Sequence, residues 1–182
     1  MAMNSAKMTI LSTIQSARKE RRALLAVLVD PDKEDAYLHL LTYLEGVDLV
    51  FVGGSTGSRV EECLSLLRAH TKAPFVLFPG NVAQFTPKAD ALLFLSLLNS
   101  RLPQVLIEPH LQVAMEVKQS GIETIPMGYI LIDGHRKSAV EIVANCHPLA
   151  NQDLSAIVRH AVAGQLLGKH LIYLEAGSGA NL

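Results

Sequence analysis

The sequence predicts an α/β fold in which short parallel strands alternate with helices. Six apolar segments recur along the chain, mostly with amphipathic segments between them, a pattern typical of right-handed βα units. The composition agrees, because 49% of the 182 residues are hydrophobic and the mean hydropathy is +0.28. Strands covered by helices on both faces are apolar throughout. No Ser/Gly-rich linker interrupts the pattern, so we expect one domain over residues 1–182.

Each element follows from a local pattern. The first segment, 23–29, is apolar at every position, and the other predicted strands are 49–52, 75–78, 91–95, 123–132 and 171–174. Helices are predicted where apolar residues recur every three or four positions, at 9–18, 34–44, 59–69, 105–119 and 153–167. Pro109 is expected to break the first turn of the fourth helix. Residues 133–152 are predicted to be a long polar connection. The pattern alone allows either an open doubly wound sheet or part of a (β/α)8 barrel.

Charge and composition exclude several classes of protein. Lys and Arg number 16 against 17 Asp and Glu, without the clustered basic excess of a nucleic-acid-binding protein. No apolar run approaches the roughly 18 residues of a spanning helix, and no secretory leader is visible. We therefore expect a cytoplasmic protein with at most peripheral membrane association. Cys63 and Cys146 lack metal or disulfide-framework spacing and are predicted to be core thiols.

Unusual residues follow the first strand, at the end where both architectures place their chemistry. The segment 30–33 reads Asp-Pro-Asp-Lys. Carboxylates at a strand end suit Mg²⁺, which prefers few carboxylates together with water and substrate phosphates. The same residues also suit a helix start, with Asp30 as the N-cap and Pro31 in the first turn. Both interpretations remain open from these residues alone.

Two further strand ends carry polar or glycine-rich turns. Residues 53–58, Gly-Gly-Ser-Thr-Gly-Ser, interleave hydroxyls with glycines before a helix and suit phosphate oxygens or a Mg²⁺ hydroxyl ligand. They match neither the dinucleotide fingerprint nor a P-loop. Pro79-Gly80-Asn81 closes the third strand, and we interpret Asn81 as a helix cap.

The last predicted strand leads into the most informative turn. Tyr173 and Glu175 are two residues apart and therefore point to the same face of the strand. Gly177-Ser178-Gly179 follows, and such a turn offers backbone N–H groups to an oxyanion. The alternative is a packed tyrosine and a surface glutamate on an ordinary turn. The coincidence of the three features favours a phosphate-bearing substrate.

In order, the segments 28–33, 52–55, 79–81, 128–134 and 173–179 resemble one family. The sequence is similar to geranylgeranylglyceryl phosphate synthases, of the branch that includes bacterial members and the PcrB-like heptaprenylglyceryl phosphate synthases. The similarity runs from about residue 8 to the end of the sequence. Each motif alone is weak, whereas the ordered set is highly specific.

The resemblance implies a TIM (β/α)8-type barrel, of which this chain would hold about six βα units and lack the last two. It implies a Mg²⁺-dependent prenyltransferase that joins a polyprenyl diphosphate, preferably geranylgeranyl, to sn-glycerol 1-phosphate through an ether bond. Asp30 and Ser55 would be the Mg²⁺ ligands, and Glu175 the catalytic group on the glycerol hydroxyls. The members of this branch assemble into homo-oligomers. The residues that would hold glycerol phosphate are Tyr173, Leu174, Glu175, Ala176, Gly177, Ser178 and Gly179.

Two other functions are weighed against this one. A truncated barrel could be catalytically silent and act through binding or assembly at its open sheet edges. Another phosphate-binding barrel enzyme, such as an isomerase, should need no Mg²⁺ and should show a paired acid and base at facing strand ends. Only Asp30 and Glu175 fit such a pair, and a diphosphate substrate explains Asp30 better.

Overall fold

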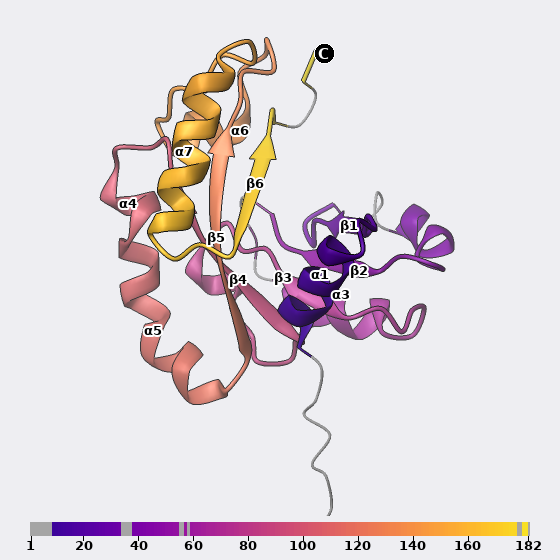
Figure 1. The fold of residues 1–182 in the computed structure, drawn as a ribbon. Coiled ribbons are helices and arrows are strands. Elements are labelled where there is room, and N and C mark those ends of the chain that lie inside the picture. Colours follow the sequence, from indigo (N-terminus) through magenta and orange to yellow (C-terminus); the bar gives the residue numbers. More distant parts are fainter. Residues whose placement is uncertain (1–8, 34–37, 55–56, 58, 178–179, 182) are drawn as a thin grey trace, which may run out of the picture.

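A computed structural model of the chain describes residues 9–33, 38–54, 57, 59–177 and 180–181. Within them, parallel strands form a six-stranded sheet in the order β1-β2-β3-β4-β5-β6 (Figure 1). A doubly wound sheet would reverse its order at a switch point, whereas this sheet keeps the order of the sequence, as a TIM-type barrel does. The α/β barrel prediction is confirmed. The strands are β1 Ala26–Val29, β2 Leu49–Val52, β3 Phe75–Leu77, β4 Ala91–Leu97, β5 Glu123–Leu131 and β6 Leu171–Glu175.

Along the chain, α1 precedes β1 and the other helices lie between successive strands. In Figure 1, α4, α5 and α7 flank β4 and β5 on one side. α7 packs on both β5 and β6. Among the described residues, no helix combines the length and the apolar character needed to cross a membrane. The helices are α1 Ile10–Lys19, η1 Leu41–Tyr43, α3 Val60–Leu67, η2 Val82–Gln84, α4 Pro103–Leu106, α5 Glu108–Ser120, α6 Ala139–Val143 and α7 Leu154–Leu166.

Two predictions about helices are wrong in detail. The single helix predicted at 105–119 is split into α4 and α5, because Ile107 leaves the helical region at φ −143° and ψ −30°. Pro109 then lies at the start of α5, where its missing N–H costs nothing. The predicted polar connection contains α6, which begins where the Ser138 hydroxyl accepts the Glu141 N–H at 3.1 Å. The helix predicted at 34–44 is described only from residue 38 onward.

The two faces of the sheet bury separate apolar layers. On the outer face, Val50 and Val52 of β2 pack with Cys63 and Leu64 of α3. Burial of Cys63 and of Cys146 raises the pKa of each thiol to about 11, and both are free, which confirms their prediction as core thiols. On the inner face, Leu49, Val76, Ala91, Leu93, Ile125 and Met127 form the second layer.

α1 closes the inner face at the end where the strands begin. Its residue Ile10 packs with the inner layer, and Leu11 and Ile14 lie against it. The Glu123 carboxylate, at the first residue of β5, accepts the backbone N–H groups of Ile10 and Leu11 at 2.8 Å each. A carboxylate at a helix N-terminus satisfies free N–H groups and complements the helix dipole. This arrangement leaves the opposite end of the strands for the chemistry.

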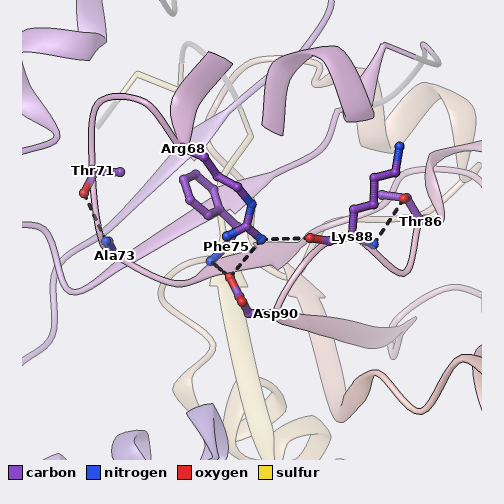
Figure 2. Close-up of polar contacts among 7 residues, drawn as sticks. All are labelled: Arg68, Thr71, Ala73, Phe75, Thr86, Lys88 and Asp90. Atoms are coloured by element: carbon purple, nitrogen blue, oxygen red, sulfur yellow. Dashed lines mark hydrogen bonds and ion pairs between the residues drawn. The ribbon is translucent and has the colours of Figure 1, made fainter. Parts of the chain in front are cut away.

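A charged network joins α3 to the beginnings of β3 and β4 (Figure 2). The Asp90 carboxylate accepts the Phe75 N–H at 2.8 Å and lies 3.3 Å from Nη2 of Arg68. The same Arg68 nitrogen donates to the Lys88 carbonyl at 2.8 Å, and the guanidinium lies 4.9 Å from the centre of the Phe75 ring. The Asp90 N–H donates in turn to the Phe75 carbonyl at 2.8 Å. Asp90 therefore fixes the alignment of the first residues of β3 and β4.

Replacing Asp90 by Ala should lower the free energy of unfolding by about 1–3 kcal/mol, because the Phe75 N–H loses its acceptor. Urea denaturation of the variant and the parent protein measures the difference. Glu116→Ala, which removes an exposed carboxylate from α5, is the matched control. Equal losses in the two variants would contradict the role of Asp90.

Candidate active site

One cavity of about 450 Å³ runs from the C-terminal ends of the strands to the side of α5. Its polar end is formed by Asp30 and Lys33 after β1, Gly53 and Gly54 after β2, and Glu175 with Gly177 at the end of β6. The rest of its wall is mainly apolar. That part includes Leu28, Phe78, Val82, Phe85, Leu92, Phe94, Val105, Val113, Val140 and Val143.

The connection between β3 and β4 borders the apolar part of the cavity. It contains only the short η2, which begins where Asn81 Oδ1 accepts the Ala83 N–H at 2.9 Å. The prediction of Asn81 as a helix cap is confirmed. Because no full helix covers β3 here, side chains such as Val82 and Phe85 reach the cavity directly. The short connection therefore supplies one wall of an elongated apolar space.

Glu175 is held at the polar end by a tyrosine from the neighbouring strand. The Tyr129 hydroxyl donates to Glu175 Oε2 at 2.7 Å. Tyr129 is only 5% exposed, and burial, followed by the nearby carboxylate, raises its pKa far above the ordinary value. Burial also raises the pKa of Tyr173, with Glu175 as the second cause. The carboxylate thus lies beside two phenols that remain protonated.

An aromatic cluster forms the apolar floor beneath this carboxylate. Phe78 lies edge-on to Tyr173 with ring centres 5.1 Å apart, and Tyr129 lies edge-on to Tyr173 at 5.3 Å. Phe51 stacks on Phe78 at 6.0 Å. Such pairs add to the burial of their rings and hold one another in place. These packed aromatic rings therefore form a fixed apolar surface beneath Glu175.

The described residues on either side of the turn after β6 contact the connection after β5. Gly177 has φ +86°, and a Cβ there would lie 2.4 Å from Cβ of Ser138. Only glycine permits both this backbone conformation and the close approach. The Asn181 N–H donates to the Gly134 carbonyl at 2.9 Å. Gly177, two residues beyond Glu175, is therefore held closely against Ser138.

The predicted glycerol phosphate residues do not all line the cavity. Glu175 and Gly177 do, whereas Tyr173 lies in the aromatic floor. The side chain of Leu174 is 54% exposed and lies outside the cavity, as alternation along the strand requires. The predicted residues Ser178 and Gly179, and the predicted metal ligand Ser55, lie outside the described residues.

Asp30 lies across the cavity from Glu175 and is shaped by the glycines after β2. Its Oδ1 accepts the Asp32 N–H at 3.1 Å, and its Oδ2 lies 3.3 Å from Lys33 Nζ. A Cβ on Gly54 would lie 2.4 Å from Asp30 Oδ1, so a larger residue there would displace the carboxylate from its present position. No three His, Cys, Asp or Glu side chains of the described residues are grouped to hold a metal ion. A single carboxylate nevertheless suits Mg²⁺, which keeps water and substrate oxygens as its other ligands.

Sequence reasoning did not select Tyr129 as a site residue. The strand pattern held the necessary information, because residues paired in register on neighbouring parallel strands point their side chains to the same face of the sheet. Tyr129 pairs in register with Tyr173, and Leu131 pairs with Glu175. Tyr129 lies two residues before Leu131, the partner of Glu175. Its side chain therefore lies on the same face of the sheet as the Glu175 carboxylate. Only the register of β5 against β6 was missing.

Comparison with known proteins gives one consistent result. The model of the PcrB family matches residues 15–182. The geranylgeranylglyceryl phosphate synthase of Zunongwangia profunda is 43% identical over 176 residues, covering 94% of this chain and 75% of that protein. The protein of the same name from Korarchaeum cryptofilum is 39% identical over 176 residues, covering 93% and 72%.

Solved structures agree with the sequence relatives. A crystal structure of the (S)-3-O-geranylgeranylglyceryl phosphate synthase of Thermoplasma acidophilum, in complex with its substrate sn-glycerol-1-phosphate, superposes with a TM-score of 0.83 and 33% identity. It is matched over 96% of this chain and 72% of that one. The wild-type GGGPS of Thermoplasma volcanium gives a TM-score of 0.82 at 31% identity, over 95% and 71% of the two chains. From the family match, the relatives and the shared fold, the chain belongs to the PcrB family.

Proposed function

We propose that this chain transfers a prenyl group from a polyprenyl diphosphate to sn-glycerol 1-phosphate and forms an ether bond. The observation that carries the proposal is the composition of one cavity. Asp30 and Glu175 face its polar end, and a long, mainly apolar wall leads away from them. A substrate with an anionic head and a hydrocarbon tail suits both parts at once.

The apolar part of the cavity is suited to the prenyl chain. Phe78 and Phe85 line it near the strand ends, and Val113 lies farther along on α5. Burying a hydrocarbon tail there contributes roughly 25 cal/mol for each Å² removed from water. Geranylgeranyl diphosphate is the preferred donor, because most of the relatives above carry its name.

The turn after β6 is suited to glycerol phosphate. Gly177 lines the cavity together with Glu175, and the backbone N–H groups of glycine-rich turns bind phosphate oxygens. The Thermoplasma acidophilum relative, which shares the fold, binds sn-glycerol 1-phosphate. Glu175 would then lie beside the glycerol hydroxyls.

Mg²⁺ is the proposed cofactor, with Asp30 and Ser55 as its protein ligands. The exposed side of the Asp30 carboxylate faces the cavity, where diphosphate oxygens and water would complete the coordination. When bound, the ion neutralises the negative charge that develops on a departing diphosphate. Lys33, whose ammonium lies 3.3 Å from Asp30, adds positive charge at the same end.

The proposed reaction releases one proton and therefore needs one general base. The allylic carbon–oxygen bond of the donor breaks first, and its electron pair leaves with the diphosphate. The glycerol 3-hydroxyl oxygen then bonds to the allylic carbon, and Glu175 accepts the hydroxyl proton. The products are the ether, diphosphate and one proton, which Glu175 releases to water. The apolar aromatic floor beneath Glu175 excludes water from the reacting carbon.

The proposed setting is a cytoplasmic homo-oligomer that meets the membrane only peripherally. Apolar side chains exposed on two helices, α5 and α7, support self-association. They include Leu111 and Met115 on α5 and Leu154, Val158 and Leu166 on α7. Size-exclusion chromatography with light scattering measures the assembly.

The proposal is tested with purified protein, labelled sn-glycerol 1-phosphate, prenyl diphosphates of several lengths and Mg²⁺. We expect an ether product, fastest with geranylgeranyl diphosphate, that is lost with a chelator and restored by Mg²⁺. No ether product with any donor would contradict the proposal and favour a protein that acts through binding or assembly. Conversion of a sugar or triose phosphate without Mg²⁺ would favour an isomerase.

A further inference from the structure

Tyr129 donates a hydrogen bond to the proposed catalytic base from the neighbouring strand. Its hydroxyl donates to Glu175 Oε2 at 2.7 Å across the β5–β6 pair. Resting on the proposed function, we propose that Tyr129 is a positioning residue that fixes the Glu175 carboxylate in the orientation in which it accepts the glycerol proton. Tyr129 itself neither takes nor gives the proton.

The environment of Tyr129 makes it a permanent donor. Burial and the adjacent carboxylate raise its pKa far above the ordinary value, so the hydroxyl keeps its proton at every pH at which the protein would work. A phenol that cannot ionise is unsuited to general-base catalysis, whereas it is well suited to holding a carboxylate by a charge-assisted hydrogen bond. The chemistry therefore assigns the base to Glu175 and the support to Tyr129.

The ring of Tyr129 is fixed independently of its hydroxyl. It packs edge-on against Tyr173 at 5.3 Å and tilted against Phe78 at 6.4 Å. The backbone of Tyr129 lies in the middle of β5, in register with Tyr173. Since ring and backbone are held by other contacts, removal of the hydroxyl alone should leave the fold intact.

The groups that face Glu175 come from three strands. Tyr129 is on β5, Tyr173 is on β6, and Asp30 and Lys33 lie across the cavity after β1. Cys146 lies near Tyr129 and is buried and protonated. Tyr129 donates to the carboxylate at 2.7 Å, and Tyr173 also lies within hydrogen-bonding reach of it. Tyr129 is the donor from the neighbouring strand, so loss of its hydroxyl removes the side-chain contact that ties Glu175 to β5.

The test is Tyr129→Phe, compared with the parent protein and with Tyr43→Phe. Tyr43 is 73% exposed, and the control makes the same chemical change away from the cavity. We expect Tyr129→Phe to lower kcat about 10-fold with little change in the KM of either substrate, because a base that is no longer held in place reacts more slowly while the binding groups remain. Tyr43→Phe should change neither value. An unchanged kcat, or an equal loss in kcat and in substrate affinity, would overturn the inference.

A second variant keeps the hydrogen bond. Tyr129→difluorotyrosine retains the ring and the hydroxyl, so its kcat should stay close to that of the parent protein. If Tyr129→Phe does not fold, a loss of kcat of about 10-fold in the folded fluorinated protein, which keeps the donor, overturns the inference.

A measurement without turnover separates this inference from the proposed function. Carboxyl carbon NMR of labelled Glu175 reports the surroundings of the carboxylate directly. At one fixed pH, its chemical shift should change in Tyr129→Phe, which removes the hydrogen bond, and stay unchanged in Tyr43→Phe. If the parent protein forms no ether, the proposed function fails while this comparison still tests Tyr129. An equal chemical shift in all three proteins would refute the positioning role.

Discussion

Replacing Glu175 by Gln should lower the rate of ether formation by about 10²- to 10⁴-fold, the usual loss when a general base is removed. Gln has nearly the same shape and can still accept the Tyr129 hydroxyl, but it cannot take up the glycerol proton. The apolar wall, which is separate from Glu175, should still bind the prenyl chain. Single-turnover kinetics and a binding titration with a prenyl diphosphate measure the two effects separately.

The matched control for this experiment is Glu116→Gln, the same substitution on the exposed face of α5. It should leave both rate and affinity unchanged. Weakened prenyl affinity with normal turnover in Glu175→Gln would assign the carboxylate to donor binding rather than to chemistry.

Replacing Asp30 by Asn should lower Mg²⁺-dependent turnover by about 100-fold or more and raise the Mg²⁺ concentration required for half the maximal rate. Asn keeps an oxygen for the Asp32 N–H, which now bonds to Asp30 Oδ1 at 3.1 Å, so the turn should persist. The substitution removes the charge that a cation requires. Rates measured across a Mg²⁺ titration give both values.

Glu116→Gln again serves as the control, because it removes an equal charge from an exposed side chain that does not line the cavity. Excess Mg²⁺ should restore part of the rate of Asp30→Asn. An unaffected rate with an unchanged Mg²⁺ requirement would remove Asp30 from the proposed metal site and leave it as a structural residue of the turn.

The sheet could be predicted from the sequence because its strands are continuous apolar runs. Residues 49–52 are a clear example, since predicted and observed bounds coincide. Helical periodicity continues across the break at Ile107, so only Pro109, two residues later, indicated from the sequence that the helix is interrupted there. α6 was missed because its short apolar stretch lies within a polar connection, and its start depends on one serine cap.

The sequence predicted the candidate site only where its residues lie within one continuous segment of the chain. Tyr173 and Glu175 share a strand, so their common face follows from alternation. The approach of Asp30 to Gly54 joins the ends of two strands, and the hydrogen bond from Tyr129 to Glu175 joins two others. These contacts depend on register and twist, which a sequence of alternating elements does not specify.

The bond between Tyr129 and Glu175 spans two strands whose backbones are themselves paired over five positions. Local openings that expose amides to hydrogen exchange begin at loops and frayed ends, whereas paired strands open at a higher free energy. The spacing of the two side chains should consequently survive openings of the surrounding connections. Glu175, the proposed base, should then keep its position during such openings.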